Sequence, residues 1–335
     1  MSKDDFSEKI SPWLDVIDEK LGLDGVPVSR RTIEAALMLV AEFVIEVGVG
    51  DQRVSSFSKV NEFVSEPWFK AVYSHVEHWY YRRYERRINN RSKQVMCGTV
   101  LVVSTAFEIE VPITKSKVET AGQTAWLSFP SGVQADEDVL AWMVDPPDWS
   151  TYDEIARVES IDTARQTASL IRRIASRLTC ANLTDELTRS LLAGVRVHLH
   201  SASSLILREG DEGGFARAQW ELQMACESAY KGLLQQQTGA FPRTHDLFTL
   251  HDQSDISEAS VRRDWLVSLP RWSEAADLRY GIGDHPTMVG ICYWYLLVMK
   301  IVAGVLDNLK GMDPTTFSVL LKKGPWLSDV PPALD

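Results

Sequence analysis

The spacing of apolar and polar residues predicts helices along most of the chain. Between residues 218 and 234, apolar positions recur at steps of three and four and form one stripe: Leu222, Ala225, Ala229 and Leu233. Gly239 and Pro242 follow this stripe and break the pattern, since both residues interrupt regular helix. We therefore predict a helix, a short break and the start of a second helix in this part of the chain.

The first half of the chain combines helices with a stretch of strand character. Helical spacing covers residues 1–50, ending near Gly48 and Gly50; it returns from about Pro67 to Asn89 and again over 151–190. Between about 95 and 130, β-branched residues and alternation with a period of two predict a small antiparallel sheet. We expect a mainly α protein, in which residues 1–190 form an N-terminal helical domain that contains this β insertion.

The last long apolar segment lies between Met288 and Leu309. Residues 288–306 are nearly long enough to cross a bilayer, but Lys300 lies among them. Apolar residues in this segment alternate at steps of four and three, as in a helix-packing seam: Met288, Cys292, Tyr295, Met299, Val302, Leu306 and Leu309. The seam explains the apolar character, so we expect a core helix and no membrane contact. Prolines after this helix predict an irregular tail at 313–335.

Composition narrows the functional classes. A length of 335 residues suggests two domains. The net charge of −11 argues against a broad nucleic-acid-binding face, although a local site is compatible with it. The four cysteines are scattered, without metal-ligand spacing or the density of a disulfide framework. This cysteine usage indicates a reducing, cytoplasmic compartment.

The order of elements after residue 195 resembles the HEPN family. The features that carry the resemblance are the helix at 218–234, the segment Arg243-Thr-His-Asp-Leu247, the turn Leu278-Arg-Tyr-Gly-Ile-Gly-Asp-His-Pro286, and the apolar helix that follows. Members of this family are four-helix domains found in nucleotidyltransferase pairs, toxins, defence ribonucleases and chaperone-linked proteins. The resemblance implies a C-terminal HEPN-like four-helix bundle at 195–312, while the first half of the chain resembles no family that we recognise.

The resemblance singles out Arg279 and His285 as candidate catalytic residues. HEPN ribonucleases use an Arg and a His that are separated by four to six residues, and five separate this pair. Cleavage by the 2′-hydroxyl of RNA needs a group that moves a proton and a cation that stabilises the phosphorane. His and Arg suit these two roles, and no metal is required. The alternative is structural, because the sequence Leu278-Arg-Tyr280 also matches the family's non-catalytic branch.

A second candidate site comprises Arg243, Thr244, His245 and Asp246. Thr244 offers a hydroxyl that predicts the N-cap of a helix, with Asp246 in its first turn. A helix start attracts phosphate, and Arg243 and His245 would add positive charge, so the segment is a candidate anion- or nucleotide-binding site. The alternative is a plain capping motif, in which His245 bonds to a neighbouring helix end.

A third candidate is the basic end of the helix at 67–89. Arg82, Arg83, Arg86 and Arg87 alternate with tyrosines, and this mixture suits RNA because bases stack on rings and phosphates pair with Arg. The same residues are also typical of a solvated face that pairs with acidic residues, or of an oligomer contact.

These features support two hypotheses about function. The first is an RNA- or nucleotide-directed protein of bacterial toxin or phage-defence type, acting as a metal-independent endoribonuclease. The alternative is a non-catalytic binding and dimerisation module. Both predict a homodimer through the C-terminal bundle, with RNA and an antitoxin or nucleotidyltransferase as further partners, and neither needs a cofactor. His198 and His200 are two apart, so they would not face each other on a helix, and we expect no metal site.

Overall fold

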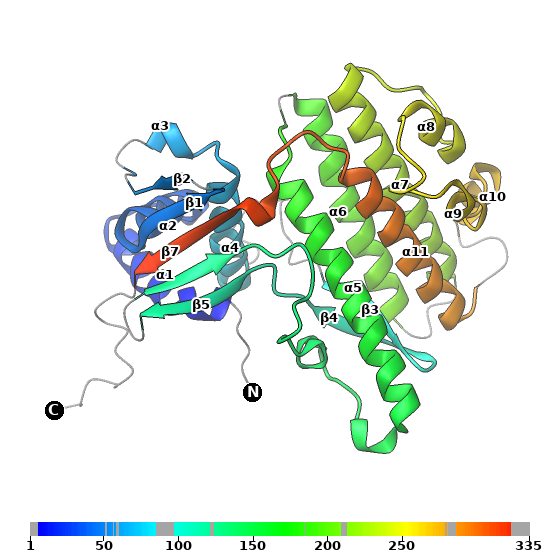
Figure 1. Cartoon of the computed structure of the whole chain (residues 1–335), viewed down its shortest axis with the longest axis horizontal. Helices are drawn as coiled ribbons and strands as arrows, with labels where there is room; N and C mark the ends of the chain where they lie inside the picture. The colour runs from blue at the N-terminus through cyan, green and yellow to red at the C-terminus, as the bar shows by residue number, and fades with distance from the viewer. Residues whose placement is uncertain are drawn as a thin grey trace. The chain divides into compact units, whose positions relative to one another are not determined.

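The chain folds as two units, and neither is continuous in sequence (Figure 1). A computed structural model describes residues 6–50, 52–55, 57, 60–84, 97–120, 124–183, 185–208, 213–278, 280 and 286–322. Unit 1 comprises Met1–Lys93, Pro112–Pro130 and Met312–Asp335, and unit 2 comprises Gln94–Val111 and Ser131–Gly311. The expected boundary near residue 190 therefore does not match the division that the structure makes.

Unit 1 is an antiparallel sheet with helices packed on it. Its strands are β1 (Val44–Val49), β2 (Gln52–Val54), β5 (Lys115–Thr120), β6 (Thr124–Ser128) and β7 (Phe317–Lys322), in the order β2-β1-β7-β6-β5. The helices are α1 (Phe6–Leu23), α2 (Val28–Phe43), the short α3 (Val60–Phe63) and α4 (Pro67–Tyr84). Both α2 and α4 contact the sheet, and α1 packs against these two helices.

Strand β7 corrects the prediction of an irregular tail. It pairs with β1 on one side and β6 on the other, so residues 317–322 lie in the middle of the sheet (Figure 1). Val319 and Leu321 alternate with more exposed neighbours and are buried, which is the period-two burial of a strand that is covered on one face. Residues 323–335 of the expected tail lie outside the described residues.

Two further secondary-structure predictions also need correction. The helix expected to run to Gly48 ends at Phe43, and the β-branched residues Val44, Ile45, Val47 and Val49 belong to β1. Such residues pack well on a pleated sheet, and the partner strand β7 is far away in sequence. The single sheet expected at 95–130 is in fact divided: β5 and β6 belong to unit 1, while β3 (Cys97–Val102) and β4 (Thr105–Glu110) form a separate hairpin in unit 2.

Unit 2 is built from four long helices and this hairpin. The helices are α5 (Glu154–Cys180), α6 (Glu186–Leu207), α7 (Gly214–Thr238) and α11 (Met288–Leu306). Helix α11 contacts α5, α6 and α7, and β3 packs against α5, α6 and α11. Three short helices, α8 (Leu247–Gln253), α9 (Arg263–Val267) and α10 (Trp272–Leu278), connect α7 to α11, and the 3₁₀ turns η2 (Val139–Trp142) and η3 (Trp149–Thr151) precede α5.

The stripe predicted for residues 218–234 is confirmed. Its four apolar residues are all buried within unit 2, and α7 ends at Gly239, whose φ of 77° is a left-handed C-cap. Helix α11 also matches its expected seam, because every seam residue from Cys292 to Leu309 is buried. Of the helices in the described part of the chain, α11 is the one long and apolar enough to cross a membrane, and 67% of its apolar window is buried inside the protein. Burial of this kind fits a core helix.

Candidate functional site

The expected catalytic pair cannot be placed. Arg279 and His285 lie outside the described residues, which resume at Pro286. On one side, α10 ends at Leu278, which is buried. On the other side, α11 begins after Thr287, whose hydroxyl accepts a hydrogen bond from the Gly290 amide at 3.1 Å. The roles assigned to Arg279 and His285 therefore stay predictions.

The segment at 243–246 adopts the arrangement of a capping motif, but the capping residue differs from the expected one. The N-cap of α8 is Asp246, whose carboxylate accepts the Thr249 amide at 3.0 Å. Thr244 precedes the cap, and its hydroxyl accepts the Asp246 amide at 3.1 Å. The carboxylate is the better acceptor at this end of the helix because it also faces the positive end of the helix dipole. Arg243 is exposed.

His245 contacts two helices of unit 2, α7 and α10. Its Nδ1 lies 2.9 Å from a carboxylate oxygen of Glu227 on α7, and its ring stacks on Trp272 of α10 with centroids 3.8 Å apart. Glu227 also accepts a hydrogen bond from Lys231 at 2.8 Å, and both of these side chains are about nine-tenths buried. These contacts hold the 243–246 segment against α7 and α10.

The assignment of Asp246 as the N-cap of α8 leads to a prediction about stability. Asp246→Ala is expected to destabilise the protein by about 1 kcal/mol at neutral pH, because the cap bond is lost. The hydrogen bond from the Thr249 hydroxyl lowers the pKa of the Asp246 carboxyl below its ordinary 3.8. Above the ordinary pKa of the carboxyl, the ionised Asp246 cap therefore contributes to the free energy of unfolding. This contribution is lost as the pH falls through the lower pKa that Asp246 has in the folded protein. The urea midpoints of Asp246→Ala and the wild type, compared at pH 7 and below pH 4, test this prediction. Thr244→Ala is the control, and it should lower the stability less than Asp246→Ala does. A larger loss in Thr244→Ala would contradict the assignment.

The basic end of α4 is partly neutralised within unit 1. Arg83 forms an ion pair with Asp15, lies 3.8 Å from the Asp18 carboxylate, and places its guanidinium over the Trp79 ring at 4.9 Å. Arg82 is exposed, whereas Arg86 and Arg87 lie outside the described residues. For Arg83 the contacts are those of a face that pairs with acidic residues, and RNA contact by the four-arginine cluster stays a prediction.

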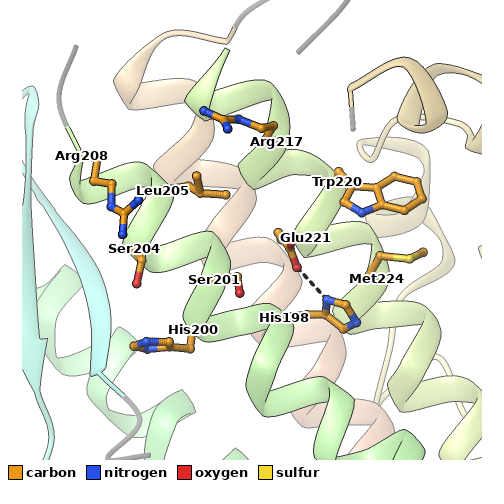
Figure 2. Close-up of a pocket in the computed structure, with 10 residues that line it drawn as sticks. All are labelled: His198, His200, Ser201, Ser204, Leu205, Arg208, Arg217, Trp220, Glu221 and Met224. Atoms are coloured by element: carbon orange, nitrogen blue, oxygen red, sulfur yellow. Dashed lines mark hydrogen bonds and ion pairs between the residues drawn. The ribbon is translucent and has the colours of Figure 1, made fainter. Parts of the chain in front are cut away.

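A groove between α6 and α7 was not anticipated (Figure 2). It has a volume of about 750 Å³, which is the size of a typical small-ligand pocket. Both helices face it with residues spaced at three and four positions, and the lining residues are His198, His200, Ser201, Ser204, Leu205, Arg208, Arg217, Trp220, Glu221 and Met224. We call this the α6–α7 groove.

The shape of the groove follows from the side chains on the two helices. Toward the start of α6, the helices approach closely, since a Cβ added to Gly232 would lie 2.6 Å from Cδ2 of Leu192. Toward the end of α6, the small side chains of Ser201 and Ser204 line the gap and leave room above them (Figure 2). An open hollow with a mixed polar and apolar lining therefore lies beside a tightly packed stretch of the two helices.

Charged groups are distributed along the α6–α7 groove in a definite order. Arg208 lies at the end of α6 and Arg217 near the start of α7, and both side chains line this end of the groove (Figure 2). Farther along the two helices, Nδ1 of His198 lies 2.7 Å from a carboxylate oxygen of Glu221, and each side chain of this pair is about one quarter exposed, at 28% and 24%. The groove is therefore lined by two arginines near one end and, farther along, by a histidine that a carboxylate orients.

An aromatic contact links the α6–α7 groove to the 243–246 segment. Trp220 lines the groove, and its ring lies 5.3 Å from that of Trp272, on which His245 stacks. Trp272 begins α10, the helix that leads to the Arg279 turn. Anion or nucleotide binding by the 243–246 segment stays a prediction.

From the sequence, His198 was assessed only together with His200, as a pair of metal ligands, and no metal site was expected there. The useful signal was the spacing of polar residues on two neighbouring helices: Ser201, Ser204 and Arg208 on α6, and Arg217 and Glu221 on α7. Such spacing identifies a solvent-facing stripe, but the register of α6 against α7 decides which residues meet. No three His, Cys, Asp or Glu side chains in the described part of the chain are grouped as a metal site requires.

Helix α11 exposes few large apolar side chains. Most of its apolar residues are buried inside unit 2, and its large hydrophobic residues with high exposure are Val289 and Tyr293. The homodimer and the protein partners stay predictions.

Comparison with known proteins adds no family assignment, because no family model, no curated protein and no solved structure matches the chain.

Proposed function

We propose that unit 2 binds RNA through phosphate groups held in the α6–α7 groove. In this proposal the chain is an HEPN-like, RNA-directed protein of toxin or defence type, and its activity is metal-independent endoribonuclease cleavage. The observation that carries the proposal is that Arg208, Arg217 and the His198–Glu221 pair all line one groove. The family resemblance of residues 195–310 supplies the expectation of RNA.

The chemistry of these side chains favours a phosphodiester ligand. Arginine presents a planar set of donors that matches phosphate oxygens, and a charge-assisted hydrogen bond is stronger than a neutral one. Two such groups at one end of a polar groove provide a local positive site in a protein whose net charge is −11. Trp220 places an aromatic ring in the groove lining, and an unpaired base can stack on the face of such a ring.

A binding experiment tests the groove directly. The full-length protein is titrated into a fluorescent single-stranded RNA, and anisotropy is measured at several salt concentrations. The Arg208→Gln, Arg217→Gln double variant is expected to bind about 10–100-fold more weakly at low salt, and the slope of log affinity against log salt should fall by about 1.4. Both effects follow from the loss of two phosphate contacts.

A matched control is available on the same helix. Arg189 is also exposed on α6, at the end far from the groove, so Arg189→Gln should keep wild-type affinity and salt slope. Equal weakening in the control and the double variant, or no weakening in either, would remove the groove as the RNA site. Cleavage of the same RNA in the presence of a chelator then tests the endoribonuclease. Binding without cleavage across a broad panel would favour the non-catalytic module.

A further inference from the structure

We infer that two copies of the chain pair through strand β5, so that the five-stranded sheet of unit 1 continues from one copy into the other. The partner is a second copy of this chain, paired antiparallel about a two-fold axis at Val118. This interface differs from the C-terminal bundle, through which the sequence predicts a homodimer. It also does not depend on RNA binding in the α6–α7 groove.

Strand β5 is an open edge of the sheet in unit 1. It is the last strand in the order β2-β1-β7-β6-β5 (Figure 1), and within the described residues β6 is the only element with more than a marginal contact to β5. In an edge strand, every second residue directs its backbone N–H and C=O away from the sheet, where a further strand can bind them. Residues 117–120 are exposed, and Val118 keeps 62% of its surface accessible. The other edge, β2, has only three residues and offers less backbone to a partner.

The order of side chains along β5 is complementary to itself when the strand is reversed. If Val118 lies opposite its own copy, Lys117 of each strand lies opposite Glu119 of the other. The same register places Ser116 opposite Thr120, so hydroxyl side chains also lie opposite each other. Neither Lys117 nor Glu119 has an ion-pair partner among the residues that the structure describes. Both charges are therefore available for cross-strand pairs, which stabilise antiparallel strands at directly opposed positions.

The charges on β5 favour one register of the strand pair. A centre at Lys117 would place this lysine opposite its own copy, and like charges at opposed positions destabilise a strand pair. Lysines on an edge strand, and a register shift such as the one between Val118 and Thr120, are also devices that prevent edge-to-edge pairing. An edge that is only protected favours no register. Self-pairing requires the register centred on Val118, and this requirement separates the two interpretations.

Charge reversal tests the interface in the full-length protein. Sedimentation equilibrium at low salt measures the dissociation constant of the wild-type dimer. Lys117→Glu places a carboxylate opposite Glu119 of the other copy, so the dissociation constant should rise about tenfold or more. Glu119→Lys should have the same effect, because it places two cations opposite each other. The double variant Lys117→Glu, Glu119→Lys exchanges the two charges, and its dissociation constant should return to within about threefold of the wild-type value.

A cysteine at the two-fold axis tests the register. Opposed residues of an antiparallel pair have Cα atoms about 4.5–5.5 Å apart, a separation that a disulfide can span, so Val118→Cys should form a covalent dimer on mild oxidation. Thr120→Cys is the matched control, because its two copies would lie about 14 Å apart along the strands, and it should run as a monomer on a denaturing gel. The wild type shows the background from Cys97, which is partly exposed.

The oligomeric state of these variants decides whether β5 is the interface. A dimer that each single reversal weakens, that the charge exchange restores and that Val118→Cys traps would support pairing through β5. A wild type that stays monomeric up to its highest soluble concentration would overturn the inference. A dimer that charge reversal leaves unchanged would also overturn it, and would favour another face such as the C-terminal bundle. Circular dichroism and melting curves check that each variant is folded, which is expected because residues 117–120 are exposed.

Discussion

Glu137→Ala is expected to destabilise unit 2 by about 3–5 kcal/mol, because it leaves a buried guanidinium without its carboxylate. Arg172 on α5 is fully buried, and it donates to the two carboxylate oxygens of Glu137 at 2.6 and 2.8 Å. It also donates to the carbonyl oxygen of Gly132 at 3.0 Å and lies over the Trp142 ring at 4.8 Å. Together with Arg165 and Ser169, Arg172 therefore attaches the 131–142 segment to α5.

Urea unfolding measured by hydrogen exchange of α5 peptides reports on unit 2 alone and provides the test. Asp264→Ala is the matched control, because its ion pair with Arg262 is exposed, at 59% for both side chains, and its midpoint should change little. The Glu137→Leu, Arg172→Met double variant should recover much of the loss, since an apolar pair leaves no buried charge. A midpoint for Glu137→Ala equal to that of the control would mean that the ion pair does not stabilise this segment.

Gly304→Ala is expected to destabilise unit 2 despite the higher helix propensity of alanine. A Cβ at this position would lie 2.2 Å from the carbonyl oxygen of Ser260 and 2.7 Å from Cγ2 of Val261. The first clash is with backbone, so α11 or the 260–261 segment must shift. Overpacking of this kind typically costs about 1–3 kcal/mol, and in an exposed helix the same change would gain about 1 kcal/mol. We expect the clash to dominate and give a net loss of about 1–2 kcal/mol.

Gly290→Ala, in the first turn of the same helix, is the control. The nearest atom to its added Cβ would be Oγ1 of the Thr287 side chain, at 3.3 Å, so a small adjustment suffices and stability should stay near that of the wild type. Denaturant midpoints of the two variants are compared under the same conditions. If the alanine at 304 is tolerated as well as the one at 290, the close approach of α11 to Ser260 is not present in solution.

The residues that determine packing and the residues that line the α6–α7 groove lie in separate parts of unit 2. Glu137, Arg172 and Gly304 act on the packing of α5 and α11, whereas the α6–α7 groove lies on the solvent-facing side of α6 and α7. Variants in the packing group should change stability without changing the salt slope of RNA binding. Variants of Arg208 and Arg217 should do the reverse.

The sequence by itself determined the elements whose signal is local. Apolar spacing was sufficient for α7 and α11, because the apolar positions that recur along each helix are buried in the rest of unit 2. Left-handed Gly239 ends α7 through a conformation that glycine adopts without strain. The strand character of residues 97–110 and 124–128 was also visible, since alternation with a period of two depends on neighbouring residues only.

Only the tertiary structure decided how distant segments combine. Residues 317–322 become a strand because β1 and β6 offer open edges on both sides, and no local pattern near 317 reveals partners that are about 190 and 270 residues earlier in the chain. The capping choice between Thr244 and Asp246 depended on where α8 begins. The His198–Glu221 pair required the register of α6 against α7, which the packing of Gly232 against Leu192 helps to define. Helix periodicity assigns a residue to a face, but the contact between two faces is set by the packing of whole helices.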